Sequence, residues 1–118
     1  MGIVIQAIRD SARGEHCTLM THRCNHNSET VVFCHAPGGG RGLATKADDW
    51  SGAYGCSACH ETLDQHRLSS TEEAVFWLRG IQRTQRRLYE KGIMSFPERT
   101  KAAKTVSKIV PRPERFRR

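Results

Sequence analysis

The sequence has few aromatic residues and no long apolar run. Aromatic residues make up 7% of the 118 residues and hydrophobic residues 37%, so any core must be small. A core of this size commonly needs a metal ion or disulfide bonds to be stable. No stretch approaches the roughly 18 consecutive apolar residues of a transmembrane helix, which predicts no membrane partner. The first residues also lack the basic start and apolar run of a secretory signal, so we expect a soluble intracellular protein.

The sequence also lacks the even number of cysteines that a full set of disulfide bonds would require. The five cysteines and six histidines all lie within residues 16–66. An odd count without a secretory signal argues against a disulfide framework. The CxxC pair at Cys56 and Cys59 makes a tight turn that points two thiolates at one centre. Two further thiolates would complete a tetrahedral set. The sequence therefore predicts a structural Zn²⁺ held by Cys17, Cys24, Cys56 and Cys59.

Other interpretations of these residues stay open. His16, His22 or His26 could replace one member of the first cysteine pair. The CxxC pair could be a redox pair of the thioredoxin type, although no βαβ pattern surrounds it. A CxxC followed by His60 also matches c-type haem attachment, which requires export. Ordinary buried cysteines are the simplest alternative.

Short elements are expected before one long helix. Residues 6–13 can make about two helical turns, with Gly14 as a stop. The β-branched and aromatic stretch 30–36 predicts a strand, and residues 53–55 predict a short second strand. Residues 60–66 are expected to form a short helix that starts at the CxxC turn.

Residues 71–91 predict a helix roughly 30 Å long. Ser70 and Glu73 match a capping box at its start, and Gly92 is a natural stop. An apolar face follows the helical period and is expected to cover the metal-binding part of the chain: Ala74, Trp77, Leu78, Ile81, Thr84 and Leu88. The other side is either a phosphate-contacting face or a solvated one, and it carries Arg79, Arg83, Arg86, Arg87 and Lys91.

The net charge of +7 is unevenly distributed. Residues 1–97 hold eleven Lys and Arg against ten Asp and Glu, whereas residues 98–118 hold eight against two. A basic tail indicates a polyanionic partner, most simply nucleic acid, bound in a salt-sensitive way. A solvated end that only aids solubility is the alternative.

The order of these features resembles a known nuclease superfamily. A cysteine pair is followed by a strand that ends in His35, a Gly-rich loop with acids, and then the CxxC with His60. This order resembles the HNH, or ββα-metal, nucleases, and within them the small lambdoid prophage nucleases typified by Escherichia coli YbcO. The resemblance covers about residues 5–92.

The resemblance implies the fold and the organisation of the chain. It implies an α+β fold in which a β-hairpin and a helix surround one divalent cation, braced by the zinc. Residues 1–95 would form this HNH-like domain, with 71–91 as its covering helix, and residues 96–118 a basic, flexible tail. A protein of this kind is expected in the cytoplasm of a bacterial host.

The resemblance also implies roles for single residues. By its match to the family's strand histidine, His35 is the candidate general base, and His60 matches the helix histidine that ligates the catalytic cation. Asp64 lies one turn after His60 on the same helical face and could be a second ligand for Mg²⁺ or Mn²⁺. Asp49, or Asp48, is expected to hold the loop or orient His35. Arg41 is a candidate for contact with the scissile phosphate.

One position departs from the family pattern. Many members carry an Asp or His ligand just before the base, where this sequence has Cys34. A thiolate suits Zn²⁺ and not Mg²⁺, so either the catalytic cation is Zn²⁺ or Cys34 faces the core. Strand alternation favours the core, because Phe33 and His35 share the other face.

Two functions follow from these residues. The leading one is a phage-type HNH endonuclease that hydrolyses phosphodiester bonds in DNA with a divalent cation. The alternative is a zinc-stapled protein that binds nucleic acid, or serves as an adaptor in recombination or replication, without cleaving. The constellation of His35, His60 and Asp64 separates the two, because only the nuclease requires a second metal site.

Overall fold

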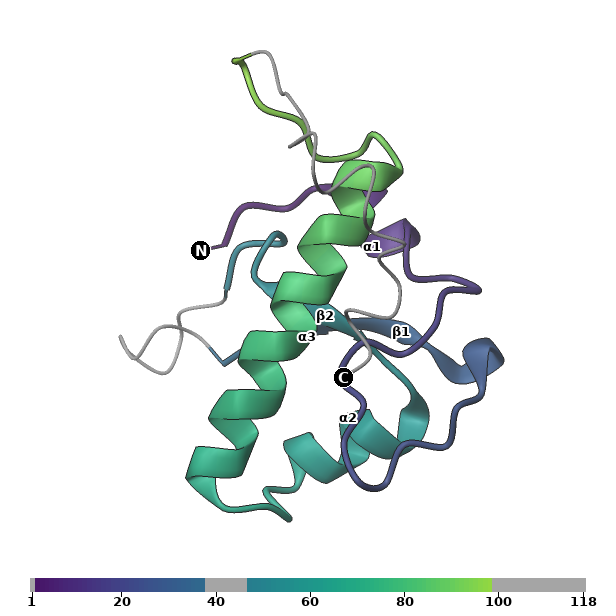
Figure 1. The fold of residues 1–118 in the computed structure, drawn as a ribbon, viewed down its shortest axis with the longest axis vertical. Helices are drawn as coiled ribbons and strands as arrows, with labels where there is room; N and C mark the ends of the chain where they lie inside the picture. Colours follow the sequence, from purple (N-terminus) through teal and green to yellow (C-terminus); the bar gives the residue numbers. More distant parts are fainter. Residues whose placement is uncertain (1, 38–46, 99–118) are drawn as a thin grey trace, which may run out of the picture.

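The computed structural model describes residues 2–37 and 47–98. Six elements follow one another: helix α1 (Gln6–Asp10), the 3-10 turn η1 (Ser28–Thr30), strands β1 (Val32–His35) and β2 (Gly52–Gly55), and helices α2 (Ser57–Asp64) and α3 (Ser70–Glu90). The structure is thus a small α+β fold. Figure 1 shows α3 lying across the sheet along the length of the molecule, with α2 beside its N-terminal end. No helix in the described ranges is long and apolar enough to cross a membrane.

The sheet is a two-stranded antiparallel hairpin. Val32 pairs with Gly55 and His35 pairs with Gly52, so both predicted strands are present, the first shorter than expected and the second one residue longer. The first strand begins at Val32 and not at residue 30, because Thr30 closes the 3-10 turn. A Cβ at Gly52 would lie within 2.7 Å of ring carbons of Phe33, so glycine is required there.

The second strand is buried along its whole length. Its free edge is closed by Thr18, from the segment between α1 and η1, and by Thr84 of α3: the Tyr54 N–H donates to their hydroxyls at 3.0 Å and 3.3 Å. The Tyr54 carbonyl accepts the N–H of Thr18 at 2.8 Å. Buried backbone groups need such partners, which explains why Thr84 is fully buried on α3.

The capping box of α3 lies one residue earlier than predicted. Ser69 is the N-cap: its hydroxyl accepts the Glu72 N–H at 3.1 Å, and the Glu72 carboxylate accepts the Ser69 N–H at 3.2 Å. The predicted pair, Ser70 and Glu73, has the same spacing, so the local pattern alone allows both registers. Glu73 instead accepts a hydrogen bond from Nδ1 of His66 at 3.1 Å.

The buried face of α3 also differs from the predicted one. Gly80, Thr84 and Leu88 are buried, whereas Leu78 is 57% exposed and Ala74 is exposed. The helix comes so close to the sheet at Gly80 that a Cβ there would lie 2.8 Å from Leu19 and 3.1 Å from Ala53. Because the helix approaches the sheet at Gly80, the stripe of Gly80, Thr84 and Leu88 faces inward, and Ala74 and Leu78 face the solvent.

The first two helices have other bounds than expected. Helix α2 begins at Ser57, inside the CxxC, because Cys56 is its N-cap and accepts the N–H of Cys59 at 3.4 Å. It ends at Asp64, two residues before the expected end. Helix α1 is a single short turn region of 5 residues, anchored by buried Ile8.

Candidate metal cluster and candidate active site

Four cysteines from two parts of the chain converge where β2 ends and α2 begins. The Sγ atoms of Cys17, Cys24, Cys56 and Cys59 all lie within 4.8 Å of one another. A tetrahedral zinc with Zn–S bonds near 2.3 Å places its sulfurs about 3.8 Å apart. Cys24 and Cys56 already lie at 3.8 Å. The four cysteines could therefore hold a metal ion with little movement.

Backbone N–H groups point at each of the four sulfurs. Met20 donates to Cys17 at 3.4 Å, and His26 donates to Cys24 at 3.4 Å. Met20 and His26 are in the left-handed backbone region, with φ of 50° and 56°. That conformation is uncommon for residues other than glycine, and here it occurs at both residues that donate to the first cysteine pair.

The CxxC sulfurs receive N–H donors from the same loop. The Thr21 N–H donates to Cys59 at 3.3 Å, and the Asn25 N–H donates to Cys56 at 3.4 Å. The Thr21 hydroxyl lies 3.1 Å from Cys59. Hydrogen-bond donors around sulfur stabilise thiolates, which is the form that binds metals.

The thiols oppose each other's ionisation. The hydrogen bond from Cys59 lowers the pKa of Cys17 to about 5, and the same contact raises the pKa of Cys59 far above its usual range. Burial raises the pKa of Cys24 to about 11. Without a cation one thiolate therefore keeps its neighbours protonated, whereas a divalent ion would compensate several thiolates together.

The histidines that could have replaced a cysteine ligand, His16, His22 and His26, do not belong to this cluster. Within residues 2–37 and 47–98 the four cysteines are the only group of three or more metal-ligating side chains this close together, and it contains no histidine. Cys34 is 3% exposed and faces the core, as strand alternation predicts. Burial raises the pKa of its thiol to about 12, so it remains protonated at neutral pH.

A second cluster forms at the opposite end of the hairpin. Nε2 of His35, the last residue of β1, lies 2.7 Å from Oδ1 of Asp49. The Arg9 guanidinium reaches the same carboxylate from α1, through Nε at 2.8 Å and Nη2 at 3.0 Å. The Ile5 N–H donates to Oδ2 of Asp49 at 2.6 Å. Three chain segments thus meet on one carboxylate.

The Asp49 carboxylate is fully buried and ionised. Its side chain is 0% exposed, and the hydrogen bond from Arg9 holds its pKa far below the usual range against the opposing effect of burial. The sequence left Asp48 and Asp49 as alternatives for contact with His35, and the structure brings Asp49 to it. Asp48 instead accepts the Ile3 N–H at 2.9 Å.

The predicted cation ligands do not join His35. His60 and Asp64 are both exposed on α2. Their spacing of four residues places them on one face of the helix. Among the described residues they form no group of three or more ligands with His35.

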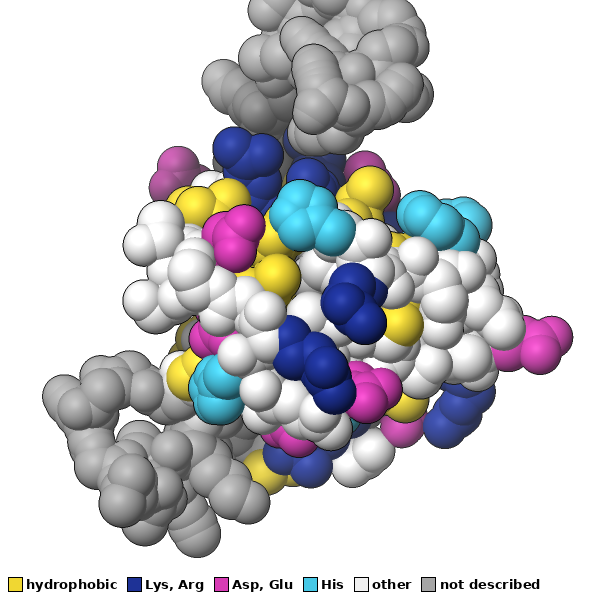
Figure 2. Space-filling model, turned by 90° about the horizontal axis from the view of Figure 1, so that it is seen from below, with side chains coloured by type: hydrophobic (Ala, Val, Ile, Leu, Met, Phe, Trp, Pro, Cys, Tyr) yellow, Lys and Arg dark blue, Asp and Glu magenta, His cyan; other side chains and the backbone are white. Residues whose placement is uncertain are grey.

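The predicted nucleic-acid contacts on α3 are partly used within the protein. Arg83 donates to the Thr18 carbonyl at 2.8 Å, and Arg87 pairs with Glu15 at 2.8 Å. Arg86 pairs with Glu90 at 3.3 Å, and Arg79 is exposed. Figure 2 shows a face on which Lys, Arg, Asp, Glu and His are mixed without a single basic patch. Arg41 and the tail beyond residue 98 lie outside the described residues.

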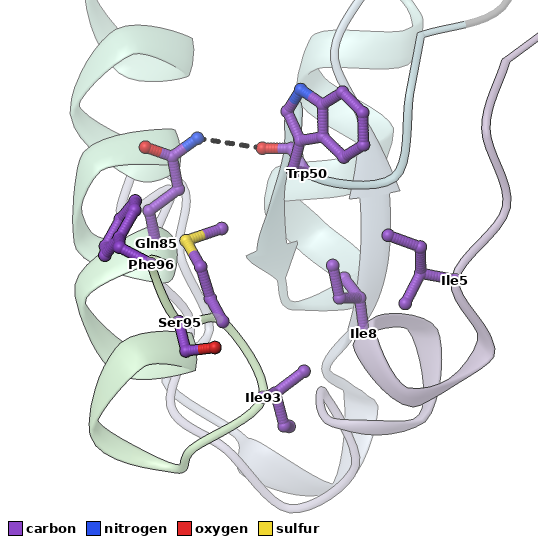
Figure 3. A pocket seen from close by; sticks show the side chains of 8 residues that line it. Ile5, Ile8, Trp50, Gln85, Ile93, Ser95 and Phe96 are labelled. Carbon is purple, nitrogen blue, oxygen red and sulfur yellow. Dashed lines mark hydrogen bonds between the residues drawn. The ribbon is translucent and has the colours of Figure 1, made fainter. Parts of the chain in front are cut away.

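An apolar groove runs beside the His35 end. It has a volume of about 490 Å³ and lies between the N-terminal segment and residues 93–96, which follow α3, with Trp50 above it (Figure 3). Ile5, Ile8, Ile93 and Phe96 are among the apolar residues that line it. The Gln85 amide donates to the Trp50 carbonyl at 2.9 Å and ties the groove to the residue that follows Asp49.

The comparisons with known proteins identify the family. The family model described as "Putative nuclease YbcO" matches residues 6–93. The chain belongs to the YbcO family. A YbcO relative from Escherichia coli K12, named "Putative nuclease YbcO", is 33% identical over 74% of this chain and 95% of its own length. A YbcO relative of the same name from Enterobacteria phage 82 matches with the same values.

A solved structure is similar to this YbcO-family chain. It is described as "a putative bacteriophage protein" from Escherichia coli K-12, and it is 29% identical. The TM-score is 0.58, and the match covers 73% of this chain and 100% of the other.

One member of the His35 cluster has no signal in the sequence. Arg9 lies 40 residues from Asp49 in a helix of a single turn, and nothing in its local pattern distinguishes it from Arg13. Only the packing of α1 against the hairpin brings its guanidinium to the carboxylate.

Proposed function

We propose that this chain is a metal-dependent endonuclease of the HNH type that hydrolyses phosphodiester bonds in DNA. The observation that carries the proposal is the contact of 2.7 Å between His35 and the buried, ionised carboxylate of Asp49. A histidine at a strand end held by a carboxylate suits a general base. The family's nuclease name supports the same reaction class.

The hydrogen bond to Asp49 defines which ring nitrogen of His35 acts. An ionised carboxylate only accepts hydrogen bonds, so Nε2 must carry the hydrogen, and Nδ1 keeps the lone pair. A water that attacks the phosphorus atom would give its proton to Nδ1. The bond from phosphorus to the 3′ oxygen then breaks, and a second water protonates that oxygen. The imidazolium formed on His35 is stabilised by Asp49.

The exposed pair on α2 suits a hard cation. We assign His60 and Asp64 as two of its protein ligands, with water completing the coordination of Mg²⁺ or Mn²⁺. A cation there would supply positive charge for the phosphoryl oxygens in the transition state. His35 then needs no direct bond to the cation, which agrees with the lack of a three-residue ligand group among the described residues.

The four cysteines are proposed to hold one structural Zn²⁺. Four thiolates with tetrahedral spacing favour zinc over Mg²⁺ or Mn²⁺. All four coordination positions are taken by protein, so this ion would leave none for a substrate. It would instead join the loop that contains Cys17 and Cys24 to the start of α2.

Nicking of a supercoiled plasmid tests the proposed function. The protein would be dialysed free of weakly bound cations, checked for one zinc per chain by mass spectrometry, and assayed with added Mg²⁺ or Mn²⁺. His35→Asn keeps a donor for Asp49 and removes the base, so we expect the cleavage rate to fall by about 100- to 10,000-fold. His66→Asn is the matched control, because His66 is 76% exposed, and its rate should equal that of the wild type. Equal rates for both variants would overturn the assignment of the base.

The alternative function is a non-catalytic adaptor that binds nucleic acid. One observation favours it: the described residues contain a single cluster of three or more metal ligands. In that case the wild-type protein would retain zinc and bind DNA but would not nick it with Mg²⁺, Mn²⁺ or Zn²⁺.

A further inference from the structure

Arg9 holds the Asp49 carboxylate through two hydrogen bonds. Nε donates to Oδ2 at 2.8 Å and Nη2 donates to Oδ1 at 3.0 Å, so the planar guanidinium matches both carboxylate oxygens. Bidentate pairs of this kind fix the orientation as well as the position of a carboxylate. His35 Nε2 contacts the same Oδ1 at 2.7 Å.

We propose that Arg9 is a positioning residue of the nuclease site, which acts on His35 through Asp49. The proposal rests on the proposed function, because it assigns to Arg9 the task of keeping His35 in the tautomer that a general base requires. Arg9 itself makes no contact with His35 among the described interactions, so its effect must pass through the carboxylate.

Because Asp49 is buried, its negative charge needs the compensation that Arg9 provides. A carboxylate with a side chain that is 0% exposed is costly to ionise unless a positive group and hydrogen bonds compensate it. Arg9 supplies the charge, and the Ile5 N–H supplies a further donor. If the carboxyl took up a proton, it could donate to Nε2, and His35 would then carry its hydrogen on Nδ1. The nitrogen that faces the attacking water would lose its lone pair.

Helix α1 gives Arg9 a fixed support. Ile8 beside it is buried, and the Asp49 N–H donates to the Ile3 carbonyl at 3.0 Å. The N-terminal segment is therefore bonded to Asp48 and Asp49 through Ile3 and Ile5 as well as through the guanidinium of Arg9. The outer part of the Arg9 side chain remains in solvent, with 39% exposed, so a shorter polar side chain there is accommodated without a buried cavity.

The tautomer of His35 is the direct readout. In ¹⁵N-labelled full-length protein, NMR of the imidazole nitrogens should show hydrogen on Nε2 in the wild type. We expect Arg9→Gln to give a mixture of both tautomers and a plasmid-nicking rate reduced by about 10- to 100-fold. Arg9→Lys keeps the charge without the bidentate geometry and should restore part of both properties. Arg13→Gln is the matched control, an exposed arginine near the end of α1, and should behave as wild type.

A double-mutant cycle separates positioning from folding. In an Asp49→Asn background, Arg9→Gln should change neither the tautomer nor the rate further, because its route of action is gone. If Arg9→Gln alone keeps Nε2 protonated and cleaves at the wild-type rate, the proposal is wrong. If the wild type does not cleave DNA but the tautomer still changes in Arg9→Gln, the nuclease assignment fails and the structural effect of Arg9 stands. Should Arg9→Gln fail to fold, the tautomer in Arg9→Lys decides.

Discussion

The two ends of strand β2 carry two kinds of polar cluster. Cys56 follows the strand directly and belongs to the four-cysteine cluster, whereas Asp49 precedes the strand by three residues and bonds to His35 and Arg9. At the cysteine end the thiols raise or lower one another's pKa and need an external cation to ionise together. At the histidine end the protein supplies its own positive charge.

This difference predicts what each end contributes. A cluster that requires a cation couples folding to metal binding. The charge of Asp49 is already compensated by Arg9 without a bound ligand. Substitution of Asp49 should therefore lower the cleavage rate more than it lowers the stability of the fold. Breaking each end separately tests that contrast.

Removing one cysteine ligand should have the largest effect. Structural zinc sites contribute on the order of 10 kcal/mol in small zinc-binding peptides, so Cys59→Ser should lose the metal and most of the cooperative unfolding transition. Metal content by mass spectrometry and thermal unfolding by circular dichroism measure both. Cys34→Ala is the matched control, since Cys34 lies outside the cluster, and it should keep one metal ion per chain. If Cys59→Ser keeps full metal content and an unchanged unfolding transition, folding does not depend on the metal at the cysteine end, and the two ends do not differ in this way.

Removing the carboxylate at the other end should cost less. Asp49→Asn leaves Arg9 without its charged partner, and we expect the free energy of unfolding to fall by about 2 kcal/mol at pH 7. Because the pKa of Asp49 is lowered in the folded state by Arg9, its contribution is complete above the unfolded value of about 3.9 and is lost as the pH falls through the folded value.

Urea unfolding of both proteins at several pH values measures this difference. The gap between wild type and Asp49→Asn should be constant between pH 5 and 7 and narrow below about pH 4. Asp48→Asn serves as the control, because an amide oxygen can still accept the Ile3 N–H, and it should match the wild type. A gap that widens on acidification would contradict the role assigned to Arg9.

A charged contact that belongs to neither end should matter least. Glu15 accepts from Arg87 at 2.8 Å and Lys91 at 2.9 Å, and the Arg87 contact is the main reason why its pKa is lowered. Near-surface pairs contribute less than about 1 kcal/mol, so Glu15→Gln should lower the midpoint of thermal unfolding only slightly. The shift should shrink further in 1 M salt, because salt screens exposed charges. A large, salt-independent shift would mean that this pair is structural.

Some parts of this architecture could be predicted from residue types and spacing. Two strands, a helix after the CxxC and a long final helix were expected, because periodicity and β-branched residues act over a few neighbours. The four cysteines were expected as one set, because metal ligation limits which side chains can converge. The predicted buried face of α3 was wrong at Ala74 and Leu78, since periodicity does not show which stripe of a helix a neighbouring sheet will contact.

Residue types and spacing by themselves pointed to the four cysteines as the leading ligand set, to His35 with Asp48 or Asp49, and to the approximate position of each element. Only the tertiary structure decided the register of the α3 cap, the choice of Asp49 over Asp48, and the pairing of Arg9 with it. The physical reason is distance along the chain. Arg9 and Asp49 are separated by 40 residues, so their contact depends on how α1 packs beside the hairpin and not on any local pattern.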